Sequence, residues 1–274
     1  MEGRQPARYP NAFTMNKYGF GGFFPFSASG RKHVSIHTLD ICAVALEDIR
    51  DIIEGDVAGV CLVYDVDHNI FSEQGDRVLD LVEAIHQVEL DCRTYDSRMI
   101  AVKSTKLGEL AKLLHFNLHL FDLRTEPDGD QASRLYAFAT NFDFEQPILS
   151  KLHDSNIFVD VHDDCYLYLE AREPKVSKRI FGRTLQTYVA AVLGRRRSMQ
   201  MAGVAEPPDS FVDRIYPTDS SITILRKETR VQRKKIMIGY STTKFRFGGG
   251  DQAYPVVGII EYDRSRGVWA ISVL

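Results

Sequence analysis

The alternation of apolar and polar positions in the first half of the chain predicts strands separated by helices. Residues 33–41, "HVSIHTLDI", alternate with a period of two, as a half-buried strand does. Residues 43–55 place apolar side chains at helical spacing and end at a glycine, which is typical of a helix. The apolar run at 59–66 predicts a buried strand, and a helix over 76–90 and a strand over 98–104 follow. Strands separated by helices favour parallel pairs in a sheet.

The rest of the pattern predicts shorter elements and then consecutive strands. In chain order, we expect a helix over 106–114, a strand over 115–123, a loop over 124–133, a strand over 134–140, a helix over 145–153, two strands within 157–171, a helix over 174–192 and a linker over 203–210. Four strands then follow with no helix between them, over 221–227, 234–241, 255–263 and 268–274. A succession of this kind is typical of an antiparallel β-meander.

These elements predict a fold between the α/β and α+β classes. We expect a mixed sheet built from β-α steps in the N-terminal half, followed by a more antiparallel C-terminal part with the β-meander. We also expect two subdomains, an acidic α/β one over residues 1–125 and a basic α+β one over residues 134–274.

The composition is that of a globular protein. The chain has 274 residues, of which 44% are hydrophobic and 26% charged, so that it can bury a sizeable core. Its N-terminal residues lack the apolar stretch of a signal peptide. Its longest apolar runs, such as "VAGVCLVY", fall short of the roughly 18 residues needed to span a bilayer. We therefore expect a soluble, cytoplasmic protein with no membrane partner.

The cysteines and the Asp/His clusters do not indicate a metal site. No Cys-x-x-Cys pair occurs, and the four cysteines stand singly in apolar segments, as buried thiols do in a reducing compartment: Cys42, Cys61, Cys92 and Cys165. Asp and His gather at 63–69 and 160–165, where predicted strands end and where turn hydrogen bonding accounts for such residues. We expect neither a metal nor a cofactor.

Charge is distributed unevenly along the chain, although the net charge is only −3. Residues 172–246 hold 17 Lys and Arg against 6 Asp and Glu, which leaves 17 basic and 31 acidic residues elsewhere. A basic region of this kind attracts phosphates by releasing their counterions. The candidate nucleic-acid-binding residues are Arg195, Arg196, Arg197, Arg233, Lys234 and Lys235.

The excess of basic residues is also compatible with two roles that involve no nucleic acid. The basic C-terminal part can pair internally with the acidic N-terminal part, or it can bind an acidic protein partner. The sequence therefore indicates a protein or nucleic-acid partner, and it does not indicate an oligomeric state.

Two stretches of the sequence echo one another. "KHVSIHTLDI" (32–41) and "LHFNLHLFDL" (114–123) both fit His-x-(Ser/Asn)-aliphatic-His-x-x-Asp-aliphatic. If both are strands, His33, Ser35 and His37 share one face of the first strand. His115, Asn117 and His119 likewise share one face of the second. Two such strands side by side would place two imidazoles near a hydroxyl and an amide, where one imidazole can act as general base and the other as general acid on a phosphate.

His33-Val34-Ser35-Ile36 resembles one half of the signature of the two-histidine phosphoesterases. That family cleaves cyclic or 2′,5′-linked phosphodiesters with paired His-x-(Ser/Thr) strands. The resemblance implies a catalytic site formed by His33, Ser35, His115 and Asn117, although Asn117 stands where the family has Ser or Thr. Period-two alternation alone also accounts for both stretches as half-buried strands. We rank a binding module that uses the basic region first, and a phosphodiester-cleaving enzyme second.

Overall fold

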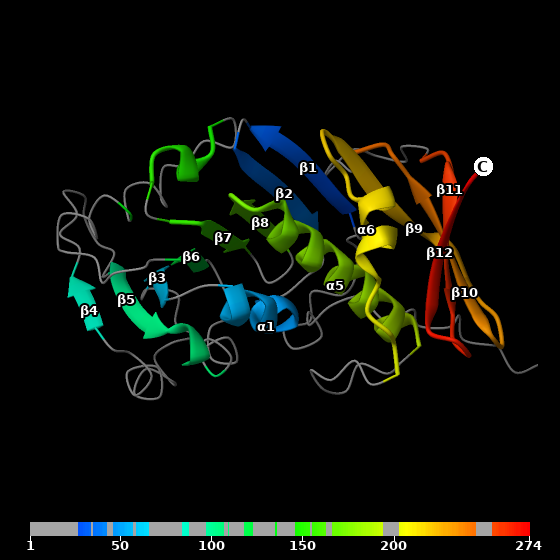
Figure 1. The fold of residues 1–274 in the computed structure, drawn as a ribbon, viewed down its shortest axis with the longest axis horizontal. Coiled ribbons are helices and arrows are strands. Elements are labelled where there is room, and N and C mark those ends of the chain that lie inside the picture. Colours follow the sequence, from blue (N-terminus) through cyan, green and yellow to red (C-terminus); the bar gives the residue numbers. More distant parts are fainter. Residues whose placement is uncertain are drawn as a thin grey trace, which may run out of the picture.

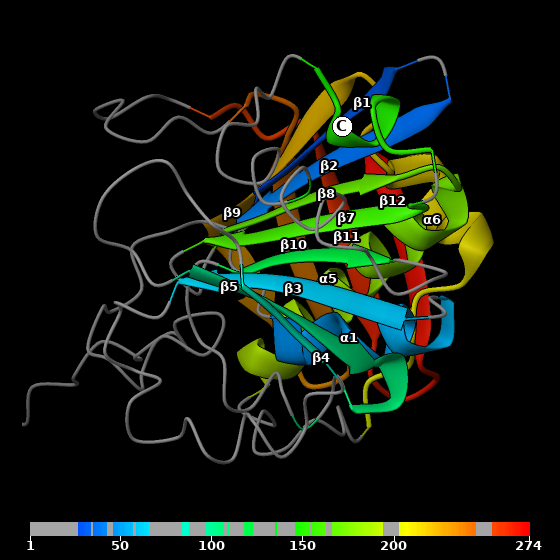
Figure 2. The same cartoon turned by 90° about the vertical axis from the view of Figure 1, so that its left-hand side faces the viewer.

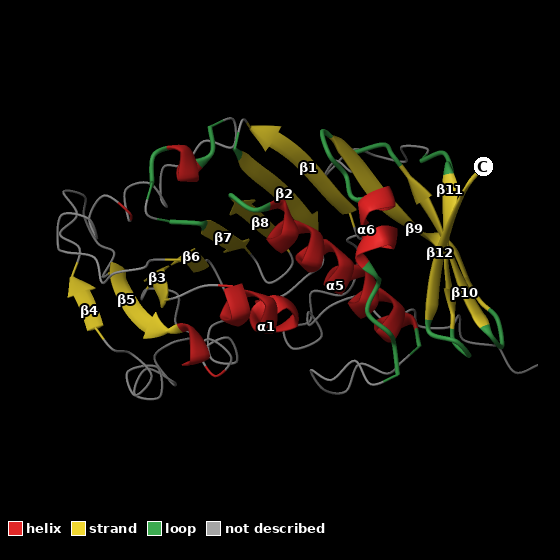
Figure 3. Ribbon diagram, in the orientation of Figure 1, coloured by secondary structure: helices red, strands yellow, loops and turns green. Residues whose placement is uncertain are grey.

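The fold is dominated by one large antiparallel sheet (Figures 1 and 3). The computed structural model describes residues 27–33, 35–42, 46–56, 59–65, 84–87, 97–106, 109, 118–122, 135, 146–153, 155–162, 166–193, 203–244 and 254–274. Twelve strands follow one another across the sheet in the order β12-β11-β10-β9-β1-β2-β8-β7-β6-β3-β5-β4. Every pair of neighbouring strands is antiparallel.

The elements have the following bounds. The strands are β1 (Ser27–His33), β2 (Ile36–Cys42), β3 (Gly59–Asp65), β4 (Ala84–Gln87), β5 (Ser97–Lys103), β6 (Leu118–Asp122), β7 (Ile157–His162), β8 (Tyr166–Ala171), β9 (Ser220–Val231), β10 (Lys235–Ser241), β11 (Gly258–Asp263) and β12 (Val268–Val273). The α-helices are α1 (Leu46–Asp56), α5 (Pro174–Val192) and α6 (Asp209–Ile215), and the 3-10 helices are η2 (Ser104–Lys106) and η3 (Ile148–Ser150).

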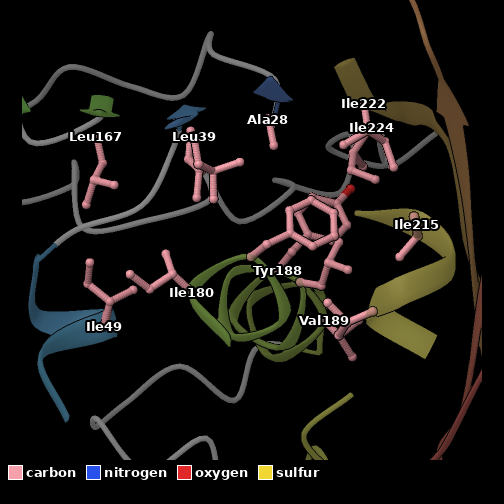
Figure 4. Packing of buried hydrophobic residues seen from close by; sticks show 14 of the residues in the cluster. Ala28, Leu39, Ile49, Leu167, Ile180, Tyr188, Val189, Ile215, Ile222 and Ile224 are labelled. Atoms are coloured by element: carbon pink, nitrogen blue, oxygen red, sulfur yellow. The ribbon is translucent and has the colours of Figure 1, made fainter. Parts of the chain in front are cut away.

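The sheet curves around the α-helices, and α5 lies at the centre of the core. In Figure 2 the strands β1, β2, β8 and β7 run side by side, with α5 and α1 behind them. Figure 4 shows Leu39 and Leu167 pointing toward α5 from one part of the sheet, and Ile222 from another. The Tyr188 hydroxyl of α5 lies 2.9 Å from the Thr229 hydroxyl of β9, so its polar end is satisfied inside the core.

The sequence explains why α5 is a long, buried helix. Pro174 occupies the first turn, where its missing N–H costs no intrahelical bond. Apolar residues recur at helical spacing on the face that meets the sheet, among them Ile180 and Val189. The buried hydroxyls of Thr184 and Thr187 donate to the carbonyls of Ile180 and Arg183, so these two polar side chains are satisfied within the helix itself.

Several predicted elements are confirmed. The meander of β9 to β12, the helix α5, the strands β3 and β5, and the pair β7 and β8 all form where the pattern placed them. A 3-10 helix, η3, lies within the short helix expected over 145–153. Within the described residues, no helix is long and apolar enough to cross a membrane.

The expectation of parallel pairs built from β-α steps is wrong for the described strands. The chain passes from β2 through α1 to β3, but β8, β7 and β6 lie between those two strands in the sheet. Strands from later in the sequence fill this space by antiparallel pairing, as β2 pairs with β8 and β3 pairs with β6. A helical connection allows two strands to become parallel neighbours, but it does not require that they do so.

Four local expectations also need correction. The strand expected over 33–41 begins only at Ile36, as β2, because His33 ends β1 and a turn at Ser35 joins the two strands. Residues 84–87 form the strand β4 inside the helix expected over 76–90. The linker expected over 203–210 ends in α6, a helix that the pattern did not predict. Leu135 is helical, although a strand was expected there. Tertiary pairing and packing decide the structure of short segments such as these, and they override local propensity.

Candidate functional site

The first of the two echoing stretches is a β-hairpin and not a single strand. His33 is the last residue of β1 and pairs with Ile36, the first residue of β2, while Ser35 lies in the turn. Lys32 pairs with His37 in the same register, so His33 and His37 occupy opposite faces of the sheet. The expected face shared by His33, Ser35 and His37 therefore does not exist.

His37 lies on the face that carries the helices. It shares this face with Leu39 and Ile41, which occupy every second position of β2 and are buried in the core. It is also close enough to Lys178 of α5 to respond to that charge. Burial lowers the pKa of His37, and the charges of Lys32 and Lys178 lower it further. His37 is therefore held more neutral than a free histidine.

The second echoing stretch is described only from Leu118 onward. His115 and Asn117 lie outside the described residues, so their catalytic role stays a prediction. The strand that follows them, β6, is separated from β1 by β2, β8 and β7. The strands β1 and β6 are therefore not neighbours in the sheet.

Polar residues form a row across the face of the sheet that lies opposite the helices. Cross-strand partners share a face, and the register aligns Ser221, Ser29, Asp40, Tyr168, Asp160 and His119 in successive strands from β9 to β6. A close contact lies at each end of this row. The hydroxyls of Ser29 and Ser221 lie 2.8 Å apart, and Nδ1 of His119 lies 3.0 Å from Oδ1 of Asp160.

Glu170 is a buried carboxylate next to this row. Its two oxygens accept the backbone N–H groups of Ile148 and Leu149, both at 2.8 Å, and the Tyr168 hydroxyl donates to Oε1 at 2.9 Å. Burial raises the pKa of Glu170, although these hydrogen bonds and the charge of Arg172 oppose the effect. The arrangement fastens η3 to β8.

Arg172 completes the attachment of this segment. Its guanidinium donates to the carbonyl oxygens of Leu149, Leu152 and Ser155, at distances of 2.6, 2.8 and 3.0 Å. These hydrogen bonds of Glu170 and Arg172 all join them to other groups of the protein. Because both side chains are engaged by backbone N–H and carbonyl groups, the arrangement serves structure better than catalysis.

The turns of the β-meander bring cationic residues together at one end of the sheet. The backbone N–H of Arg264, between β11 and β12, donates to the carbonyl of Lys234, between β9 and β10, at 2.7 Å. The guanidinium of Arg264 also lies 3.5 Å from the carbonyl oxygen of Arg233. The two turns therefore lie side by side. We call this cluster the basic end: Arg230, Arg233, Lys234, Arg264 and Arg266.

Asp263 fixes the second of these turns. Its carboxylate accepts the hydroxyl of Ser265 at 2.7 Å and the guanidinium of Arg266 at 2.9 Å, together with two backbone N–H groups. The hydrogen bond from Ser265 is the main reason that the pKa of Asp263 lies far below its usual range, and Arg266 adds to the effect. Asp263 therefore stays charged and holds the turn rigid.

Part of the basic region is neutralised within the protein. Lys235 pairs with Glu261 at 2.7 Å, and Lys178 pairs with Asp213 at 2.7 Å. Arg183 binds Asp51 at 2.8 Å, which joins the basic and acidic parts of the chain. Internal pairing thus accounts for some of these cations, among them the predicted binding residue Lys235.

Two predicted binding residues remain exposed at the basic end. Arg233 and Lys234 have no ion-pair partner among the residues that the structure describes, and both are exposed to solvent. The exposed side chains of Val231 and Val268 stand at the bases of the two turns. Arg195, Arg196 and Arg197 lie outside the described residues.

Arg264 and Arg266 were not among the binding residues predicted from the sequence, because the basic region was counted only as far as residue 246. The predicted meander contained the signal that would have found them. In four consecutive antiparallel strands, the first and third turns lie at the same end of the sheet, so residues 232–234 and 264–267 had to meet there.

No group of three or more potential metal ligands occurs among the described residues. Comparison with protein-family models, with curated proteins and with solved structures finds no match to this chain.

Proposed function

We propose that this protein is a binding module that recognises a polyanion, in the first instance nucleic acid, through the basic end of its β-meander. The observation that carries the proposal is the bond from Arg264 to Lys234, which places two cationic turns side by side. Arg233 and Lys234 are exposed there and are not neutralised by any described acidic residue.

The rigidity of the two turns supports binding. The carboxylate of Asp263 accepts four hydrogen bonds from its own turn, and the first turn is tied to the second through Lys234. A surface that is already ordered loses less conformational entropy when it binds a partner. Guanidinium groups also bind phosphate oxygens with two parallel hydrogen bonds, which suits Arg233 to a phosphate backbone.

The test measures binding of the whole protein to single- and double-stranded RNA and DNA over a range of salt concentrations, by fluorescence anisotropy. For duplex DNA we expect the logarithm of the affinity to fall with the logarithm of the salt concentration by about 0.9 per phosphate contact. Replacing both Arg233 and Lys234 with alanine should reduce that slope by about 1.8 if each residue contacts a phosphate.

The matched control is the double variant Lys175→Ala with Lys244→Ala. This variant also removes two positive charges. Lys175 lies in the first turn of α5 and Lys244 follows the end of β10 that is away from the basic end, and both lysines are exposed. An equal reduction of the salt slope in this control would show that only net charge matters and would refute a localised site. Absence of binding at low salt would refute the nucleic-acid proposal and leave an acidic protein surface as the partner to test.

We do not extend the proposal to phosphodiester cleavage. The described residues offer no specific observation in its favour, since His33 and His37 lie on opposite faces and β1 is not a neighbour of β6. The catalytic set of His33, Ser35, His115 and Asn117 stays a prediction that activity measurements must test.

A further inference from the structure

The strand β12 forms one edge of the sheet and carries none of the usual features that protect an edge. It has the sequence "VWAISV", without a charge, a proline or a bulge. Its only strand partner among the described residues is β11. Edge strands of this kind are prone to pair with another strand, and proteins normally blunt them with lysine, proline or a bulge.

The pairing of β12 with β11 determines which backbone groups point outward. The N–H of Leu274 donates to the carbonyl of Val257 at 3.0 Å, so Leu274 belongs to the set of residues bonded to β11. Hydrogen-bonded and non-hydrogen-bonded pairs alternate along an antiparallel ladder. Trp269, Ile271 and Val273 therefore direct their N–H and C=O groups away from β11, toward the free edge.

Exposed apolar side chains gather on the same strand. Val268 is 49% exposed, Val273 is 77% exposed and the adjoining Leu274 is 74% exposed. The described residues include only one other large hydrophobic side chain that is exposed, Val231 at 54%. An edge that presents both unpaired backbone groups and apolar side chains is suited to an extended protein segment.

One antiparallel register matches β12 to a second copy of itself. With Ile271 on a two-fold axis, Trp269 of each copy stands opposite Val273 of the other. In that register all three outward-facing residues, Trp269, Ile271 and Val273, exchange both of their backbone groups with the other copy. Val268 then stands opposite Leu274, so two of the exposed apolar side chains cover one another.

We propose that two copies of this chain associate through antiparallel pairing of their β12 strands, with Ile271 on the two-fold axis. The result is one sheet that continues from copy to copy. The proposal does not depend on polyanion binding, because it uses the edge backbone and apolar side chains and none of the cations of the basic end.

Arg214 of α6 already approaches this edge. Its Nη2 atom lies 3.5 Å from the carbonyl oxygen of Ile271, which agrees with the outward direction of that carbonyl. A contact of this length is weak, and a carbonyl oxygen has two lone pairs. The pairing therefore needs only a small movement of an exposed arginine side chain.

The first test is sedimentation of the intact protein over a range of micromolar concentrations. We expect a monomer–dimer equilibrium whose dissociation constant rises on the order of tenfold in the double variant Val268→Asp with Leu274→Asp, because like charges then face each other across the joint. The control is Val231→Asp with Lys175→Ala, which changes the net charge equally and removes an exposed valine away from β12. A protein that stays monomeric at every concentration, or a control that weakens association as much, would overturn the proposal.

The second test is a disulfide cross-link that reads the register. Ala270 stands opposite Ser272 of the other copy as a non-hydrogen-bonded pair, with Cα atoms about 4.5 Å apart, within reach of a disulfide. A mixture of Ala270→Cys and Ser272→Cys chains should cross-link on mild oxidation. Neither variant should do so alone, because identical positions are about 7–8 Å apart diagonally. Cross-linking by one variant alone, or none in the mixture, would contradict the proposed register.

Discussion

Arg183 of α5 binds Asp51 of α1 through two parallel hydrogen bonds, each of 2.8 Å. The guanidinium side chain is only 17% exposed, whereas that of the aspartate is 53% exposed. Arg183 also contacts Glu206 at 3.3 Å, so it joins α1 and the segment before α6 to the central helix. The pair connects the acidic and basic parts of the chain by joining α1 to α5, two of the helices that the sheet curves around (Figure 1).

We expect a double-mutant cycle on Arg183→Gln and Asp51→Asn to give a coupling energy of about 0.5–1 kcal/mol, since the bidentate geometry is favourable but the aspartate is largely solvated. The measurement is the free energy of unfolding in urea. The pair Lys178 and Asp213 is the control, because both side chains are substantially exposed and the contact is monodentate. A larger coupling energy for the control than for Arg183 and Asp51 would contradict this interpretation.

Gly239 accommodates a bulge in β9. The register between β9 and β10 changes between Ile238 and Gly239, and a Cβ at Gly239 would lie 2.6 Å from the Cβ of Glu228. We expect Gly239→Ala to destabilise the protein by about 1–3 kcal/mol. Adding Glu228→Gly removes the clashing side chain. The loss of unfolding free energy in the double variant should therefore be at least about 1 kcal/mol smaller than the sum of the losses in the two single variants. Additive losses, measured by denaturation, would show that the contact does not determine the cost.

The parts of the fold that the sequence predicted are those that local pattern decides. The helix α5 has a first-turn proline and apolar residues at helical spacing over five turns, and few alternative structures satisfy that pattern. The meander was predictable because β9 to β12 follow one another with short turns or a single connection, and consecutive strands usually become neighbours.

The parts that were not predictable depend on partners far away in the sequence. The turn at Ser35 interrupts an alternating run, and nothing in that run distinguishes a turn from a continuous strand. The strand that precedes the turn is paired outside the run, where β9 binds residues 27–30 of β1, while β8 pairs with β2 after the turn. The strand β4 forms within a helical pattern because it pairs with β5. The basic end likewise required two turns to meet, although its cations are separated by about thirty residues of sequence.

The stability of the protein should depend on the ionisation of Glu170. Because burial raises its pKa above the ordinary value of 4.5, the folded state binds this proton more tightly than the unfolded state does. The stabilisation that this tighter proton binding gives to the folded state is fully present below pH 4.5, and it is lost as the pH rises through the raised pKa of Glu170. The Glu170→Gln variant places an amide NH2 against one of the two backbone N–H groups. We expect it to lower the free energy of unfolding by about 1–3 kcal/mol at acidic pH and by less at higher pH. Unfolding free energies over a pH series measure this difference.

The Tyr168→Phe variant provides the control for Glu170. The hydroxyl of Tyr168 donates to Glu170 and thereby lowers the pKa of that carboxyl group. Its removal should move the loss of stability to higher pH without abolishing it. A shift to lower pH, or a pH series that is the same in wild type and Glu170→Gln, would contradict the assignment.

Finally, we expect the purified protein not to hydrolyse 2′,3′-cyclic or 2′,5′-linked nucleotides. General acid–base catalysis requires each imidazole within about 3 Å of a reacting oxygen, directly or through one water. His33 ends β1, and three strands separate β1 from β6, the strand that follows His115 in sequence. At about 4.8 Å between neighbouring strands, β1 and β6 are about 19 Å apart along the sheet. The assay compares the wild type with His33→Ala and His115→Ala, with circular dichroism to check the fold. Turnover that either substitution abolishes would establish the enzyme and would displace the binding module as the function of this protein.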